Sequence, residues 1–274
     1  MLCPNCHEQE RSRLTSSPCP KCGHVWWDTE DYTRHLVAQW GGAKGATVLD
    51  IGCGNKGVIA EAFWRETKAA KIYACDRHVI KKMSPPVEPL LMDAENLLTV
   101  LGPDSVDFVT HCGLLEHIEA DKALRILHVL ERITRKGIFF TCSSVLRKVD
   151  GKVLVDGNPF HYYKSCWGSQ EFEALGYTMD VERMANQTTF LFETTGWCQP
   201  KQIATPWEER VAKCRAIMEA RTCSHEGCAE MPKFWYAVDR QWYCLEHGME
   251  HRPDILNQIN GAMYDVCAKV PEGG

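Results

Sequence analysis

The middle of the chain alternates apolar strand-like segments with helix-like segments, and this pattern constrains the fold more than any other feature. Residues 57–68 and 123–133 space their apolar side chains as one face of a helix does. Five strand-like segments surround them, at residues 46–51, 71–76, 87–92, 106–111 and 137–142. Regular β–α alternation predicts an α/β fold with a mostly parallel, doubly wound sheet covered by helices on both faces. Residues 176–181 and 188–194 are expected to close it as a seven-stranded sheet, with an antiparallel pair.

A glycine-rich turn follows the first predicted strand. Its sequence is Val48-Leu-Asp50-Ile-Gly52-Cys-Gly54-Asn-Lys-Gly57. Ligands of such sheets bind beyond the carboxyl ends of the strands, and glycines let the backbone come close to them. The turn alone does not separate a dinucleotide site from other nucleoside sites. Asp76, at the end of the second strand, is also placed as the ribose-binding acid of an NAD-dependent oxidoreductase would be.

Three details favour a different nucleoside ligand. Asp50 precedes the first glycine, where a carboxylate would repel a pyrophosphate but attract a sulfonium that carries an ammonium group. Asp93 and Ala94 follow the third strand, where an acid and a backbone amide can recognise an adenine edge. The fourth strand continues into Cys112-Gly-Leu-Leu-Glu-His117-Ile, a loop that begins a helix at the same edge of the sheet.

Together the segments V-L-D-I-G-C-G-N-K-G, A-C-D, M-D-A-E and H-C-G-L-L-E-H-I resemble class I S-adenosylmethionine-dependent methyltransferases of the L-E-H-I type. The resemblance covers about residues 40–196. It implies S-adenosylmethionine as the cofactor and a set of residues that bind it. These are Gly52 and Gly54 at the methionine part, Asp50 near its ammonium, Asp76 at the ribose hydroxyls, Asp93 with Ala94 at the adenine, and His111 or Cys112 below the sulfonium.

The acceptor side of the site is less defined by the sequence. Methyl transfer is an in-line displacement that depends mainly on positioning, with a base only where the nucleophile must lose a proton. His117 and His161 are the candidate catalytic residues. His161 belongs to a polar and aromatic loop, residues 158–167, where the resemblance places a cover over the substrate. The alternative for His117 is packing within its own helix.

Cysteines cluster at both ends of the chain. Two C-x-x-C pairs, Cys3 with Cys6 and Cys19 with Cys22, have the spacing of a four-cysteine zinc ribbon. Near the other end, a three-sulfur, one-nitrogen zinc site is predicted from Cys223, Cys228, Cys244 and His247. The segment 234–243 between these pairs is expected to form a hairpin that turns at residues 239–240. His7 and His24 at the first site, and His225 and His251 at the second, are alternative ligands.

Eight further cysteines, at positions 53, 75, 112, 142, 166, 198, 214 and 267, occur singly, several of them in apolar runs. Cysteine in such runs is typical of a small buried side chain, and the pattern favours a reducing compartment. The chain shows no apolar segment of membrane-spanning length and no secretory signal, so we expect it in the cytoplasm, or in a virion or host cytoplasm if it is viral. With a net charge of −5 and no segment that is basic overall, the chain gives no support for a nucleic-acid surface, although a local patch stays open.

The sequence therefore predicts a zinc ribbon at residues 1–26, a methyltransferase-like catalytic domain at 27–200, and a helical linker with a second zinc module at 201–274. The predicted function is transfer of a methyl group from S-adenosylmethionine to RNA, protein or a small molecule. The zinc modules would bind a macromolecular substrate or partner, or brace the catalytic domain. The alternative from another class is a non-catalytic binding or assembly protein, viral or phage proteins included, that retains the fold.

Overall fold

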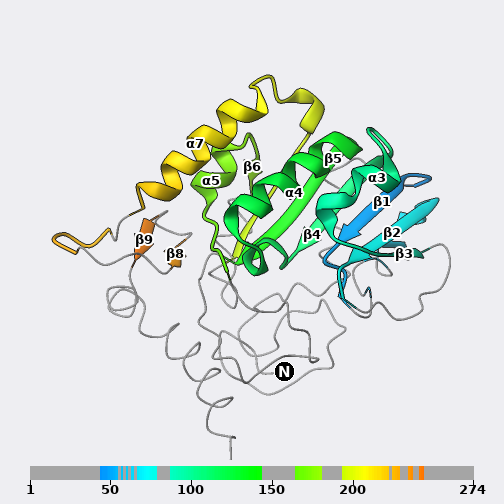
Figure 1. The fold of residues 1–274 in the computed structure, drawn as a ribbon, viewed down its shortest axis with the longest axis horizontal. Helices are drawn as coiled ribbons and strands as arrows, with labels where there is room; N and C mark the ends of the chain where they lie inside the picture. The colour runs from blue at the N-terminus through cyan, green and yellow to red at the C-terminus, as the bar shows by residue number, and fades with distance from the viewer. Residues whose placement is uncertain are drawn as a thin grey trace, which may run out of the picture.

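The computed structural model describes residues 44–54, 57, 60, 63–64, 67–78, 87–143, 164–180, 193–221 and 224–228, together with the backbone of 234–236 and 241–243. A seven-stranded sheet forms its centre (Figure 1). The strands are β1 (Thr47–Ile51), β2 (Lys71–Asp76), β3 (Val87–Leu91), β4 (Val106–Cys112), β5 (Thr134–Ser143), β6 (Thr178–Met179) and β7 (Glu193–Cys198). Their order across the sheet is β3-β2-β1-β4-β5-β7-β6.

The first strand lies in the middle of the parallel part of the sheet. Val48 pairs with Ile72 of β2 on one side and with Phe108 of β4 on the other. Residues 48–51 are all buried, as expected for a strand whose two faces are both covered. The five parallel strands expected from the sequence are confirmed, and most of their ends lie within one or two residues of the expected positions. The exception is β5, which begins three residues earlier than expected.

The last two strands of the sheet run antiparallel to their neighbours. β7 pairs with β5 and with β6 in that sense, which confirms the expected closing pair. The second strand of this pair begins at Glu193, later than the expected segment 188–194, of which 188–192 lie outside the described residues. Gly196 permits the close approach of β6, because a Cβ atom there would lie 2.5 Å from the carbonyl oxygen of Thr178.

Helices cover the sheet in two layers. The front layer in Figure 1 contains α3 (Leu98–Leu101) and α4 (Ala120–Ile133), with α5 (Ser169–Ala174) and α7 (Trp207–Glu219) beside them. Its core is built by apolar side chains of the sheet together with Leu127, Leu130 and Phe172. A second core lies on the other face, where Ala60 and Phe63 come from helical positions of the segment predicted at 57–68. The doubly wound arrangement is therefore present in the described part of the chain.

A buried ion pair attaches α7 to this core. The Arg210 guanidinium donates to both carboxylate oxygens of Glu131 on α4, at 2.8 and 2.6 Å, and also to the carbonyl oxygen of Leu175. Its remaining nitrogen donates to the carbonyl oxygen of Thr205, and the indole of Trp207 lies 4.9 Å from the guanidinium carbon. Because every face of the guanidinium has a partner, α7 is held in one position on α4 and α5.

Two smaller features agree with the sequence. β8 (Phe234–Tyr236) and β9 (Gln241–Tyr243) pair antiparallel, which confirms the predicted hairpin, although its turn lies outside the described residues. Cys75, Cys142, Cys166, Cys198 and Cys214 are buried, and no disulfide occurs in the described part of the chain. None of the helices described is long and apolar enough to span a membrane.

The buried pair yields a stability prediction. Arg210→Met should lower the free energy of unfolding by about 3 to 5 kcal/mol, because it leaves the Glu131 carboxylate buried without its partner. The double variant Arg210→Met, Glu131→Leu should recover much of this loss, since it buries no uncompensated charge. Urea unfolding of the single and double variants measures both effects. A single variant as stable as the wild type would show that the pair does not hold α7.

Candidate functional site

The glycine turn lies at the carboxyl edge of the sheet, directly after β1. The backbone N–H groups of Gly52 and Cys53 donate to the carbonyl oxygen of Cys75, which extends the pairing with β2 beyond the strand end. Gly52 and Gly54 have φ values of +70° and +65°, in the left-handed region that favours glycine. A Cβ atom at Gly52 would lie 3.0 Å from Leu114, whereas at Gly54 no described atom lies within 4 Å. The turn therefore packs against Leu114 at Gly52, whereas no residue of the described ranges packs against Gly54 in this way.

Asp76, the last residue of β2, fixes the turn from the neighbouring strand. One carboxylate oxygen accepts a hydrogen bond from the N–H of Gly54 at 2.9 Å, and the other accepts one from the N–H of His78, also at 2.9 Å. Each carboxylate oxygen has two lone pairs, so both can accept a further hydrogen bond. The structure thus brings together the Gly54 backbone and the acid that the resemblance assigns to the ribose hydroxyls.

Asp50 lies beneath the turn rather than at its mouth. Its carboxyl group is 1% exposed, points to the same face of β1 as Val48, and accepts a hydrogen bond from the backbone of Ala60. One oxygen, Oδ2, has no hydrogen-bond partner among the described residues. Burial raises the pKa of Asp50 to about 8; the Ala60 hydrogen bond opposes this shift and the charge of Asp76 adds to it. Burial therefore favours the neutral form of the acid whose charge was expected to repel a pyrophosphate.

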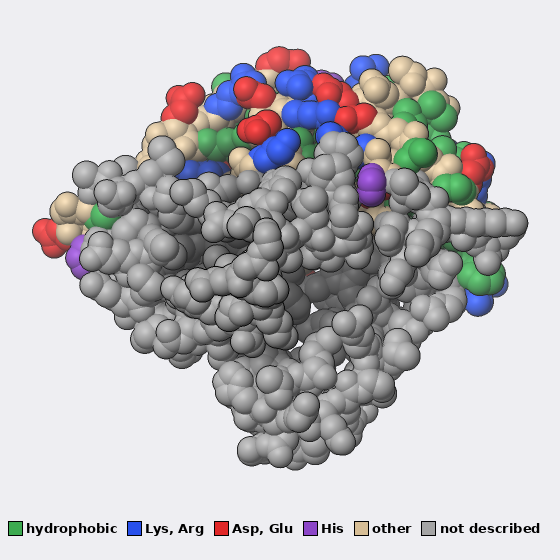
Figure 2. Space-filling model, turned by 60° about the horizontal axis from the view of Figure 1, so that its bottom comes forward, with side chains coloured by type: hydrophobic (Ala, Val, Ile, Leu, Met, Phe, Trp, Pro, Cys, Tyr) green, Lys and Arg blue, Asp and Glu red, His purple; other side chains and the backbone are tan. Residues whose placement is uncertain are grey.

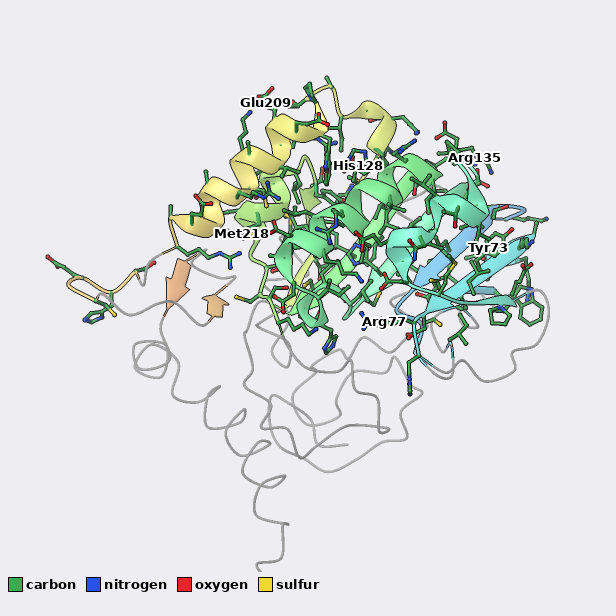
Figure 3. All side chains as sticks on the ribbon, viewed as in Figure 1. Tyr73, Arg77, His128, Arg135, Glu209 and Met218 are labelled. Atoms are coloured by element: carbon green, nitrogen blue, oxygen red, sulfur yellow. The ribbon has the colours of Figure 1, made fainter. Side chains whose placement is uncertain are left out.

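Asp93 follows β3 and begins the short helix η1 (Ala94–Asn96). One oxygen accepts from the N–H of Glu95 at 3.2 Å, and the other accepts from the ammonium of Lys122 on α4 at 2.5 Å. Arg77, labelled in Figure 3 at the end of β2, has a guanidinium nitrogen 3.8 Å from the same oxygen. Partial burial works against ionisation, but these hydrogen bonds and cationic charges outweigh it and hold the pKa of Asp93 below its usual value.

His111, which the resemblance places below the sulfonium, lies in the interior of the domain. Its side chain is completely buried on the α4 face of the sheet, with its ring stacked on Phe140 at 5.6 Å between centroids. Neither ring nitrogen has a hydrogen-bond partner among the described residues. The structure gives His111 a packing position, and its contact with a cofactor stays a prediction.

The L-E-H-I segment forms the next part of the carboxyl edge. Its short helix η2 (Leu115–His117) starts just after Gly113, whose N–H donates to the carbonyl oxygen of Thr141 on β5. The carbonyl oxygen of Glu116 accepts from the N–H groups of Lys164 at 2.7 Å and Ser165 at 3.2 Å.

These contacts attach residues 164–165 to the helix that carries one candidate catalytic residue. The hydroxyl of Ser165 lies within hydrogen-bond distance of the carbonyl oxygens of Leu115 and Ile118. His117 is partly exposed, while the other candidate, His161, lies outside the described residues.

The predicted zinc ligands lie almost entirely outside the described residues. Cys228 is described, and it is half-buried; the other seven ligands of the two sites are not. Within the described ranges, no group of three or more histidine, cysteine and acidic side chains could hold a metal ion. The same ranges show acidic and basic side chains interleaved on the face drawn in Figure 2, rather than gathered by sign.

Comparison with known proteins identifies the region that carries this edge. Residues 49–142 match a family model described as a methyltransferase domain. They form a methyltransferase domain. The match runs from β1 to β5 and includes the glycine turn, Asp76, Asp93 and the L-E-H-I segment. No curated protein matches the sequence.

Solved structures similar to this chain include three that are described as methyltransferases. One, from Anabaena variabilis ATCC 29413, is described as a methyltransferase from an antibiotic biosynthesis pathway; it is 23% identical over 42% of this chain and 45% of its own, with a TM-score of 0.37. One from Listeria monocytogenes is described as an S-adenosylmethionine dependent methyltransferase, with 15% identity over 61% and 97% of the two chains and a TM-score of 0.43. The magnesium protoporphyrin IX methyltransferase of Synechocystis PCC 6803, solved with bound SAH, is 18% identical over 62% and 80%, with a TM-score of 0.42.

This chain spans less than half the length of the Anabaena protein. All three TM-scores are below 0.5, so the assignment of the methyltransferase domain rests on the family match.

Sequence reasoning missed two residues of this edge, Lys122 and Ser165. Lys122 occupies the first turn of an amphipathic helix, where a lysine ordinarily reaches solvent, and no sequence pattern connects it to Asp93. Ser165 stands in the polar segment 158–167, which was singled out for its histidine and aromatic residues. Only the tertiary structure shows that the Ser165 hydroxyl holds this segment against η2.

The buried imidazole of His111 leads to a prediction on pH dependence. Burial lowers the pKa of His111 to about 3 from an ordinary 6.5, so the unfolded chain binds one more proton than the folded chain between these values. The contribution of His111 to the free energy of unfolding is complete at pH values above its pKa in the unfolded chain, and it decreases as the pH falls below that value. From about pH 7 to about pH 5 the wild type should lose about 2 kcal/mol relative to His111→Leu. Urea unfolding of both proteins at each pH provides the measurement.

The difference between the two proteins isolates this effect from Asp50. The raised pKa of Asp50 acts in the opposite direction, because the folded state then holds the extra proton and loses stability as the pH rises from about 4 to about 8. Since both proteins contain Asp50, its contribution cancels in the comparison. Parallel stability curves for the two proteins would contradict a buried, neutral His111.

Proposed function

We propose that the chain is an S-adenosylmethionine-dependent methyltransferase. The observation that carries the proposal is the carboxyl edge of the methyltransferase domain, where the open Gly54 turn is hydrogen-bonded to Asp76. S-adenosylmethionine, when bound, supplies a methyl group on a positively charged sulfur. The described residues fit it, because they offer open space, a ribose-binding acid and a partly exposed acid one strand further along.

In the proposed mechanism the residues of the chain bind and orient. The Gly52–Gly54 turn lets the backbone approach the methionine part, and Asp76 accepts hydrogen bonds from the ribose hydroxyls while it keeps the turn in place. The resemblance assigns Asp50 to the ammonium, and one oxygen of its buried carboxyl group has no hydrogen-bond partner among the described residues. Alignment of an acceptor atom with the methyl group contributes most to such a displacement, since its rate depends on geometry.

Proton removal is the remaining step on the acceptor side. In the displacement a lone pair of the acceptor forms the new bond to the methyl carbon while the carbon–sulfur bond breaks and its electrons return to sulfur. Where the acceptor carries a proton, His117 or His161 would accept it; His117 lies on η2 next to the segment 164–165. RNA, protein and small-molecule acceptors are separate arms of the test.

A matched pair of glycine variants tests the cofactor site. Gly54→Ala should weaken binding of S-adenosylhomocysteine by about tenfold or more, because its methyl group enters the open side of the turn. Gly102→Ala is the control, since Gly102 has a similar φ of +72° and equally open surroundings after α3. Both variants should lose about 1 to 3 kcal/mol of stability from the backbone strain, the control more, because the ψ of 171° at Gly102 lies in a region restricted to glycine. The control should nevertheless bind within about twofold of wild type. Calorimetry measures binding.

The same titrations separate the candidate functions. Heat with NAD but not with S-adenosylmethionine would favour the oxidoreductase and overturn the proposal. Binding without transfer from a labelled methyl donor to protein, RNA or small-molecule fractions would favour a non-catalytic binding protein. Equal loss of binding in Gly54→Ala and Gly102→Ala would remove the turn from the site.

We also propose the domain organisation and the zinc modules that the cysteine spacing indicates. The zinc ribbon would span residues 1–26 and the second module the end of the segment 201–274, with either one contacting a macromolecular substrate or partner. The paired strands β8 and β9 between the predicted ligand pairs support the second module. We also propose a reducing, cytoplasmic setting for the protein, which is consistent with the absence of disulfides among the described cysteines.

Metal analysis of the purified full chain tests these modules. It should give about two zinc ions per chain, both tetrahedral, with four thiolates at the first site and three thiolates and one imidazole at the second. Cys6→Ser and Cys244→Ser should each remove about one zinc ion. Cys267→Ser is the control; Cys267 belongs to neither predicted site, so this variant should remove none. A zinc content near one ion per chain that only Cys6→Ser lowers would contradict the second module.

A further inference from the structure

A chain of alternating charges crosses the carboxyl edge of the sheet beside the proposed cofactor site. It runs from Arg77 through Asp93, Lys122 and Glu95 to Arg125, and its members come from the ends of β2 and β3 and from α4. Lys122 is the centre of the chain, with its ammonium 2.5 Å from Asp93 and 3.7 Å from Glu95. Its side chain is 26% exposed, so it is among the least solvated of the lysines in the described ion pairs.

The position of Lys122 in its helix is unfavourable by itself. Lys122 is the third residue of α4, and a cation in the first turn of a helix is repelled by the positive end of the helix dipole. The two acids that face it compensate for this repulsion. The lysine is thus held toward Asp93 by contacts from a different part of the chain, 29 residues away in sequence.

The register of the strands places Asp93 where the base of a bound nucleoside would lie. Asp76 pairs with Leu91, and the N–H of Met92 donates to the carbonyl oxygen of Asp76 at 2.9 Å, so Asp93 lies just beyond the ribose-binding acid on the next strand. Neighbouring strands are about 4.8 Å apart, so the ends of β2 and β3 bring Asp76 and Asp93 to adjacent positions at this edge. Asp93 remains 27% exposed and can accept a further hydrogen bond.

We propose that Lys122 is a positioning residue for recognition of the cofactor's adenine, and that it acts by holding the Asp93 carboxylate in the orientation that accepts a hydrogen bond from the 6-amino group. The proposal rests on the proposed function. Asp93 is fixed at one oxygen by the Glu95 N–H and at the other by Lys122, so its carboxylate plane has one orientation. Without Lys122 the second oxygen is released, and the acid can turn toward Arg77 or solvent.

The experiment compares S-adenosylhomocysteine with its analogue that carries hydrogen in place of the 6-amino group. Calorimetry on the full chain gives the ratio of the two dissociation constants, which isolates the contact with the 6-amino group. The wild type should prefer S-adenosylhomocysteine by about tenfold or more, as expected for a hydrogen bond to a charged group. Lys122→Met should reduce this preference to about twofold, and Lys122→Arg should restore most of it, since the charge and the donors are kept.

Lys136→Met is the matched control. Lys136 forms the same type of pair with Asp107 at the amino end of the sheet, the end where Arg135 lies in Figure 3, far from Arg77. This variant should keep the wild-type preference. A Lys122→Met variant that loses affinity for both ligands equally, or that keeps the full preference, would overturn the inference. A wild type that binds neither ligand would instead overturn the proposed function.

Discussion

The parallel pairing of β1 with both β2 and β4 is the constraint on which the rest of this structure depends. It aligns Ile51 with Cys75 and with His111, so that three strands end at the same edge within one or two residues of each other. The glycine turn, Asp76 and the L-E-H-I segment meet there because the strands that precede them are in register. A slip of one residue in β1 would turn Asp50 to the opposite face of the sheet and remove the turn from Asp76.

Burial then decides which of the polar groups at this edge can act. Asp76 and Asp93 are held by backbone and side-chain donors and keep part of their surface, so they can accept hydrogen bonds from a ligand. Asp50 and His111 are enclosed, and burial shifts the pKa of each toward its neutral form. The edge therefore combines two partly exposed acids, which can accept further hydrogen bonds, with two enclosed groups that belong to the interior.

The remaining elements attach to this centre through polar contacts between distant segments. Arg210 joins α7 to α4 through Glu131, Ser165 joins the segment 164–165 to η2, and Lys122 joins α4 to Asp93 after β3. Each contact uses a charged or polar group that a packed interface can bury only with its partner present. Such contacts fix position as well as stability, which is what a displacement in line with a methyl group requires.

The sequence by itself determined the parallel strands, the antiparallel close, the β8–β9 hairpin and the residues of the glycine turn, because these follow from local apolar patterns and from turn chemistry. It also identified Asp76, which ends β2, and Asp93, which follows β3. Only the tertiary structure decided that Asp50 lies beneath the turn, that His111 stacks on Phe140, and that Lys122 holds Asp93. Burial and partners of a side chain depend on segments far away in sequence, and no local pattern records them.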